Sequence, residues 1–154
     1  MPPEHLHLLL NHFPIVGLAV ALIPLVIGIA TRHRTTIGAG LIAVLLCAGT
    51  IPFVMETGEE AAERFGDDKI APPLDEAGSR ALMTHGRLAE RASKPVYAAA
   101  ILAAIGLLTL WKFPRALFPV AIVTLVIAAI GVAACIQTAD AGGKIRHPEF
   151  RQAP

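Results

Sequence analysis

The chain alternates between long apolar runs and short polar connections. Four runs contain no Asp, Glu, Lys or Arg, and they cover residues 13–31, 35–55, 95–111 and 116–139. At about 1.5 Å of rise per residue, helices of these lengths span about 25 to 36 Å, which matches a hydrocarbon core of about 30 Å. The pattern therefore predicts an all-α integral membrane protein, a four-helix bundle in which residues 1–154 form one domain.

The composition supports a membrane location. Hydrophobic residues make up 55% of the chain and the mean hydropathy is +0.62, above the usual values for a soluble domain. A soluble fold would have to hide four helices that are apolar on every face, and 154 residues provide too little interior for that. The first run is followed by Arg32 rather than by a small-residue cleavage site, so we expect it to remain in the mature protein.

The short connections predict the orientation in the membrane. The loops 32–34 and 112–115 carry four cations in seven residues, whereas the 12 residues before the first run carry no Lys or Arg. Basic loops stay in the cytoplasm. We therefore expect both termini and the long segment 56–94 on the outer side, which for a bacterial inner membrane is the periplasm.

Segment 56–94 is predicted to form short helices on the outer face. Thr57 and Glu60 have the spacing of a capping box that begins a helix, and Gly66 can end it after two turns. A second helix is expected from about residue 76 to 92, with either a break or a kink at Pro95 before the third membrane helix.

Both ends of the chain are expected to lie over the same face. Residues 4–11 favour a short helix after Pro2-Pro3. After the fourth run, Gly142-Gly143 permits a sharp reversal that would return His147 to the outer surface, although a solvent-exposed tail explains the same residues. Cys47 and Cys135 lie at different depths in the runs and are interpreted as packing residues.

Several short motifs carry a resemblance to a known family. They are the block from His5 to Gly17, then Thr57-Gly58-Glu59 with Glu63, then His85, and finally Gly142-Gly143 with Ile145 and His147. Together they resemble the small bacterial membrane proteins grouped as "domain of unknown function 2231". The chain has Glu60 where the family usually has Pro, and Gly86-Arg87 where acids usually follow the loop histidine. The resemblance implies a four-helix membrane unit, sometimes attached to iron–sulfur electron-transfer domains, with no established activity.

The histidines predict a b-type haem site near the outer face. Two histidines from different segments would ligate the iron axially, and small residues in the helices would leave room for the ring. His12 with His85 is the preferred pair, with His147 as the substitute. A six-coordinate iron of this kind would transfer electrons.

Two alternatives stay open. One is a non-haem iron, copper or zinc site, because mixed imidazole and carboxylate ligands suit such ions. Its ligands would come from His5, His7, His12, His85 and His147 with Glu59 or Glu63. The other is a structural or partner-binding membrane protein whose outer polar residues form ordinary caps and ion pairs.

The sequence also limits the expected partners. We expect the lipid bilayer and a redox protein, with self-association into a homo-oligomer left open. There is no basic, aromatic-interleaved face for nucleic acid, and no phosphate loop or nucleophile motif that would identify an enzyme class. Whether the chain catalyses a reaction is left undecided by these residues.

Overall fold

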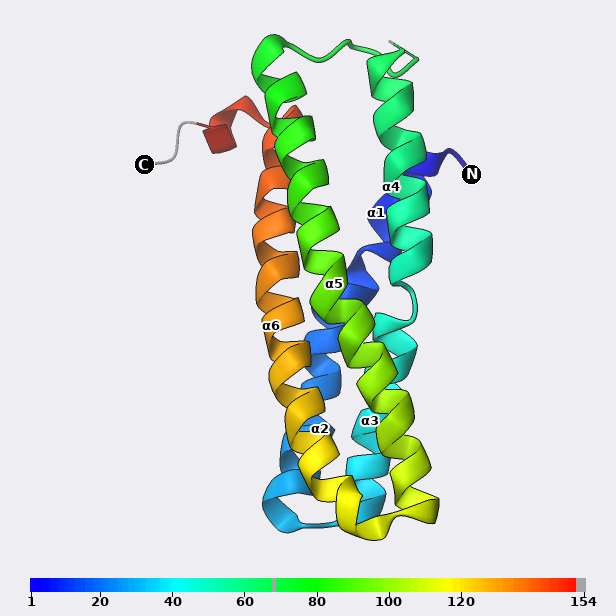
Figure 1. Cartoon of the computed structure of the whole chain (residues 1–154). Coiled ribbons are helices and arrows are strands. Elements are labelled where there is room, and N and C mark those ends of the chain that lie inside the picture. The colour runs from blue at the N-terminus through cyan, green and yellow to red at the C-terminus, as the bar shows by residue number, and fades with distance from the viewer. Residues whose placement is uncertain (68, 152–154) are drawn as a thin grey trace.

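The computed structural model describes residues 1–67 and 69–151 as a bundle of long helices (Figure 1). The helices are α1 (Pro3–Leu10), α2 (Leu18–Thr31), α3 (Arg34–Ala48), α4 (Ile51–Gly66), α5 (Glu76–Lys112) and α6 (Pro114–Arg146). A π-helical turn, Phe13–Gly17, joins α1 to α2, and a 3-10 turn, Pro148–Arg151, follows α6. The predicted all-α class is confirmed.

Within the described residues, four helical stretches are long and apolar enough to cross a membrane. They are Pro3–Thr31, Arg34–Gly66, Glu76–Lys112 and Pro114–Arg146. Each contains one of the predicted charge-free runs and extends beyond it toward the end of the bundle at which both chain termini lie (Figure 1). We call this the terminal end. The opposite end, formed by the two short basic loops, is the basic end.

The helix expected to begin at Thr57 begins earlier. α4 starts at Ile51, with Pro52 in its first turn, where a missing N–H costs nothing. Thr57 is consequently buried in the helix interior, and its hydroxyl donates to the Phe53 carbonyl at 2.7 Å. The predicted capping box is therefore wrong, although Gly66 does end the helix as expected.

The two helices expected at about residues 76–92 and at 95–111 form one continuous helix, α5. Asp75 caps its start by accepting a hydrogen bond from the Gly78 N–H at 2.6 Å. Pro95 lies inside α5 without breaking it. The break that was one of the two predictions for Pro95 therefore does not occur. His85 lies on the part of α5 that extends beyond the apolar run.

The predicted reversal at Gly142-Gly143 does not occur. α6 runs through both glycines to Arg146, and neither has a positive φ. His147 follows as an exposed residue whose Nδ1 lies 2.9 Å from Glu149 Oε1 and whose ring stacks on Phe150. The tail therefore lies on the surface, which was the alternative to the predicted reversal.

Small residues let the long apolar helices pack closely. A Cβ at Gly28 of α2 would lie 2.5 Å from the Ile37 nitrogen, and a Cβ at Gly40 of α3 would lie 2.6 Å from the Leu25 nitrogen. The backbones of α2 and α3 thus touch directly. Around this contact the core is apolar, with Leu18, Leu41 and Val96 fully buried.

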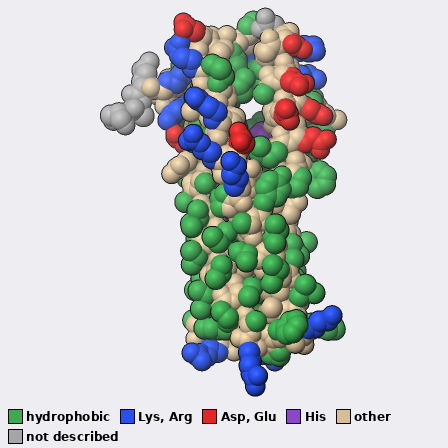
Figure 2. Space-filling view, in the orientation of Figure 1, with side chains coloured by type: hydrophobic (Ala, Val, Ile, Leu, Met, Phe, Trp, Pro, Cys, Tyr) green, Lys and Arg blue, Asp and Glu red, His purple; other side chains and the backbone are tan. Residues whose placement is uncertain are grey.

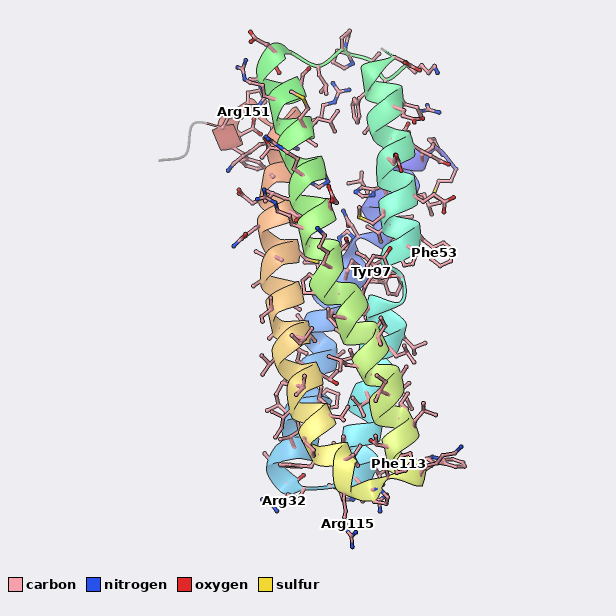
Figure 3. The ribbon with its side chains drawn as sticks, viewed as in Figure 1. Arg32, Phe53, Tyr97, Phe113, Arg115 and Arg151 are labelled. Atoms are coloured by element: carbon pink, nitrogen blue, oxygen red, sulfur yellow. The ribbon has the colours of Figure 1, made fainter. Side chains whose placement is uncertain are left out.

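Apolar side chains also cover the outside of the bundle. Many are exposed on every helix between the two ends, and Figure 2 shows them as a band with charged side chains above and below it. Arg32 and Arg115 lie at the basic end with Phe113, whereas Phe53 and Tyr97 lie where the band meets the terminal end (Figure 3). An exposed apolar belt of this extent is unusual for a soluble monomer and suits contact with lipid.

At the terminal end the helices separate into two pairs (Figure 1). α1 packs on α4, and we call this pair the N-terminal arm; α5 packs on α6, and their extensions form the C-terminal arm. The Glu4 carboxylate and the Arg64 guanidinium, 3.2 Å apart, join the helices of the N-terminal arm. Arg146 of α6 joins the two arms, because its guanidinium lies 4.9 Å from the Phe65 ring centroid and donates to the Pro72 carbonyl at 2.5 Å.

Candidate functional site

A cavity of about 450 Å³ lies between the two arms. α1 and α4 form one wall with Asn11, Val54 and Met55, and α5 and α6 form the other with Ala89 and Cys135, so that the lining is mainly apolar. In Figure 2 it appears as a hollow at the terminal end in which a histidine side chain is visible. Enclosed apolar cavities with a few polar groups are the usual form of ligand sites.

His7 enters the cavity from the N-terminal arm. It is half-buried on α1, and its Nδ1 lies 3.0 Å from the Val54 carbonyl oxygen of α4. A carbonyl oxygen only accepts hydrogen bonds, so Nδ1 must carry the proton and donate. In the neutral ring the other nitrogen, Nε2, then keeps a lone pair.

His85 enters from the C-terminal arm in the same manner. It lies on α5, and its Nδ1 donates to the Thr138 carbonyl of α6 at 2.8 Å. Its Nε2 is therefore also left with a lone pair in the neutral ring. Metal-ligating histidines commonly hold their second ring nitrogen on a backbone carbonyl in this way.

The two imidazoles face each other across the cavity. Their ring centroids are 6.1 Å apart and the ring planes are nearly perpendicular, at 87°. Each ring is held by the helix it packs on rather than by the other histidine. The arrangement thus presents two preorganised nitrogen ligands from independent walls.

The charged residues around the cavity differ between the arms. Glu59 of α4 and Glu90 of α5 line it, and Lys94 lies 3.8 Å from Glu90. Outside the cavity lining, α4 exposes Glu56, Glu60 and Glu63, whereas α5 exposes Arg87 and Arg91. In Figure 2 acidic side chains consequently gather on one side of the hollow and basic side chains mainly on the other.

The structure brings together only some of the residues predicted for a site. His7, Glu59 and His85 line the cavity. His12 does not, because its side chain is exposed and its Nδ1 is held by the Leu8 carbonyl at 2.7 Å. Of the histidines in the first segment, the structure thus brings His7, and not His12, close to His85.

The remaining candidates lie outside the cavity. His5 and Glu63 are exposed, and His147 is engaged with Glu149 in the tail. Across residues 1–67 and 69–151, no three His, Cys, Asp or Glu side chains gather closely enough to hold a metal ion. The predicted mixed site of histidines and a glutamate is therefore not assembled in this part of the chain.

The two backbone carbonyls of the site were not identified from the sequence, and its two glycines, Gly58 and Gly142, were named there only as parts of short motifs. Gly58 packs against the His7 ring and Gly142 against the His85 ring. Glycine in a helix interior is unfavourable relative to alanine and often has a packing reason, which is the signal that could have pointed to these positions.

Comparisons of the chain with protein-family models, curated proteins and solved structures find no match. The resemblance to the domain of unknown function 2231 proteins therefore stays a prediction, and the cavity has to be interpreted from its own chemistry.

Proposed function

We propose that this chain is a membrane-anchored b-type haem protein that transfers electrons, with His7 and His85 as the two axial ligands. The observation that carries the proposal is the histidine pair itself. Two imidazoles from opposite walls of an apolar cavity each donate Nδ1–H to a carbonyl and keep Nε2 available. This is the protonation state that a neutral histidine ligand requires.

The spacing of the rings fits a single metal ion between them. An imidazole nitrogen binds a transition metal at about 2.0–2.1 Å, which puts the centroids of two rings on opposite sides of one ion roughly 6 Å apart. The centroids of His7 and His85 are 6.1 Å apart.

The number of protein ligands favours haem over a bare ion. A zinc ion in a protein usually takes three or four side-chain ligands. The porphyrin supplies four nitrogens, so haem iron needs only the two axial residues. The described residues offer two histidines and no cluster of three potential ligands, which favours haem over the non-haem alternative.

The mainly apolar walls of the cavity suit an apolar group. Bound haem would supply one-electron redox chemistry with a potential set by its axial ligands and by burial. The chain would supply the two imidazoles, hold their orientation through Val54 and Thr138, and keep water away with residues such as Met55 and Ala89. With both histidines holding it, the haem would suit electron transfer better than substrate binding.

The cavity is proposed to lie at the outer boundary of a bacterial inner membrane. Ile51, Val54 and Cys135 of its lining belong to the charge-free runs, whereas His7 and His85 lie beyond them. The basic end would face the cytoplasm by the positive-inside rule, and both termini the periplasm. A redox partner would then reach the site from the periplasm or from the outer half of the bilayer.

The proposal is tested by optical spectra of protein purified from cells that are supplied with haem. We expect a Soret band and the spectrum of six-coordinate low-spin iron, with one iron per haem by elemental analysis. Replacing His7 or His85 with Ala should abolish the low-spin spectrum and reduce haem content to a minor fraction. His5→Ala and His12→Ala are matched controls on the same segment and should leave the spectrum unchanged.

Two results would contradict the proposal. A protein without a Soret band despite adequate haem supply is not a haem protein, and metal without porphyrin in such a sample would return the non-haem alternative. A low-spin spectrum that survives both His7→Ala and His85→Ala would place the haem elsewhere.

A further inference from the structure

The two histidines are held by the same local construction, repeated in both arms. His7 donates to the carbonyl of Val54 and packs against Gly58, four residues later on the same helix. His85 donates to the carbonyl of Thr138 and packs against Gly142, again four residues later. In each case an imidazole lies on the surface of a neighbouring helix, over a carbonyl and over the position one turn beyond it.

The glycines are in direct contact with the rings. A Cβ at Gly58 would lie 2.9 Å from His7 Cε1 and 3.0 Å from its Nδ1. A Cβ at Gly142 would lie 3.0 Å from His85 Nδ1 and 3.1 Å from its Cε1. These separations are shorter than ordinary carbon contacts of about 3.5–4.0 Å, so a methyl group would displace each ring.

These contacts distinguish Gly58 and Gly142 from the other helical glycines. Gly28 and Gly40 allow one backbone to touch another, which is helix packing. Nothing lies within 4 Å of a Cβ built at Gly66 or Gly86. Only at Gly58 and Gly142, among the glycines of the described residues, are the nearest atoms those of a cavity histidine.

We propose that Gly58 and Gly142 are positioning residues that seat His7 and His85 against α4 and α6, and thereby keep Nδ1 on its carbonyl and Nε2 free for a ligand. Their role in ligand binding rests on the proposed haem function. Their role in fixing the rings does not, because the contacts exist within the protein alone. A displaced ring would have a weaker hydrogen bond to its carbonyl, and the tautomer with the proton on Nδ1 would be less strongly preferred.

The ring-fixing role is tested without any cofactor, by nitrogen NMR of ¹⁵N-histidine-labelled protein in micelles. In the native chain we expect His7 and His85 in the Nδ1–H tautomer. Gly58→Ala should shift the ring nitrogens of His7 and leave those of His85 unchanged, and Gly142→Ala should do the reverse. The larger shift is expected at His7, where the added methyl group would lie closer.

Gly66→Ala and Gly143→Ala are matched controls on α4 and α6. A Cβ at Gly66 would have no atom within 4 Å, and one at Gly143 would lie at an ordinary 3.5 Å from the Phe150 ring, so neither variant should shift the ring of His7 or His85. Imidazoles are the ends of flexible side chains and can move, so Gly58→Ala and Gly142→Ala are both expected to fold. Should Gly58→Ala fail to assemble, Gly142→Ala, with the longer contact, decides the question alone.

A second measurement tests whether the two positioning glycines affect the proposed haem site. In haem-loaded protein, Gly58→Ala and Gly142→Ala should change the reduction potential and the low-spin electron paramagnetic resonance signal, and the two control variants should change neither. If the ring nitrogens shift in protein that binds no haem, the positioning role of the two glycines is supported and the haem proposal is refuted. If the ring nitrogens stay unchanged in folded Gly58→Ala and Gly142→Ala, the positioning role is refuted, whether or not haem binds.

Discussion

Helical phase decides which histidine of the first segment can enter the cavity. His5 and His12 are seven residues apart and share a helix face, whereas His7 lies about 200° around the helix from His5. Periodicity alone therefore separates His7 from the other two, but it does not indicate which face turns inward. Leucines occupy α1 on several sides, and the contact with Gly58 that selects His7 involves residues 51 positions apart.

The contact between α2 and α3 gives a prediction for a single methyl group. In Gly40→Ala, the added Cβ would lie 2.6 and 2.7 Å from the backbone nitrogen and Cα of Leu25, which cannot rotate away. We expect a loss of about 1–3 kcal/mol in the free energy of unfolding, the usual cost of overpacking. Denaturant unfolding in mixed micelles measures it.

Gly86→Ala is the matched control for that loss. It also replaces a helical glycine, but no atom lies within 4 Å of the new Cβ. Alanine should stabilise this helix position by up to about 1 kcal/mol. Equal stability changes in the two variants would show that the close approach of α2 and α3 does not constrain position 40.

At the scale of the elements, the charge-free runs predicted where helices cross but not where they end. The local signals at Thr57 and at Gly142-Gly143 are typical of a helix start and of a turn. Both positions are nevertheless inside helices. The Thr57 hydroxyl bonds back to the Phe53 carbonyl within α4, and His85 fills the space that Gly142 leaves on α6. The second contact joins distant segments and leaves no local pattern in the sequence.

The start of α5 gives a prediction about pH. Asp75 caps this helix and also binds the Arg151 guanidinium of the tail, with Arg151 Nη1 2.7 Å from Asp75 Oδ2. The hydrogen bond from Arg151, followed by that from the Gly78 N–H, lowers the pKa of Asp75 below its usual range. The attachment of the tail should therefore be intact at neutral pH and lost as the pH falls below about 4, through the lowered pKa.

Hydrogen exchange of residues 147–151 between pH 3 and pH 7 measures that attachment. Protection should fall with the protonation of Asp75 in the native chain. In Asp75→Asn protection should be low throughout, because the amide forms no ion pair with Arg151. A tail that remains equally protected at pH 3 and in Asp75→Asn would show that other contacts, such as Arg151 with the Lys144 carbonyl, hold it alone.

At the scale of the molecule, the bundle could be predicted and the arms could not. Four long charge-free runs permit little except four apolar helices, since composition alone excludes burying them in a small soluble core. The division of the terminal end into two pairs depends on which polar extension packs on which. That choice is made by a few contacts, such as Glu4 with Arg64 and Arg146 with Phe65.

Arg146 gives a prediction about the distance between the arms. It is the described side chain that connects α6 both to the α4 ring of Phe65 and to the loop carbonyls of Ile70 and Pro72. In Arg146→Gln the cation–π contact is lost and the arms should separate at their tips. The distance distribution between spin labels at positions 60 and 87, in a chain with both cysteines replaced by Ala, should become longer and broader.

Lys144→Gln is the control for Arg146→Gln. Its ammonium group pairs with Asp140 of the same helix, one turn away, so the pair makes no connection between the arms. The label distances should match those of the native chain. Arms that stay together in Arg146→Gln would assign their connection to the loop backbone instead.

The chain order of the two arms has a consequence for biosynthesis. All the residues that hold His7 have been synthesised once residue 66 has been made. His85 must wait for the Thr138 carbonyl 53 residues later and for Gly142 after it. A chain that ends before α6 therefore contains the residues that hold His7 but lacks those that hold His85. Under the proposed function, binding of haem by both histidines has to wait until the last helix has been synthesised.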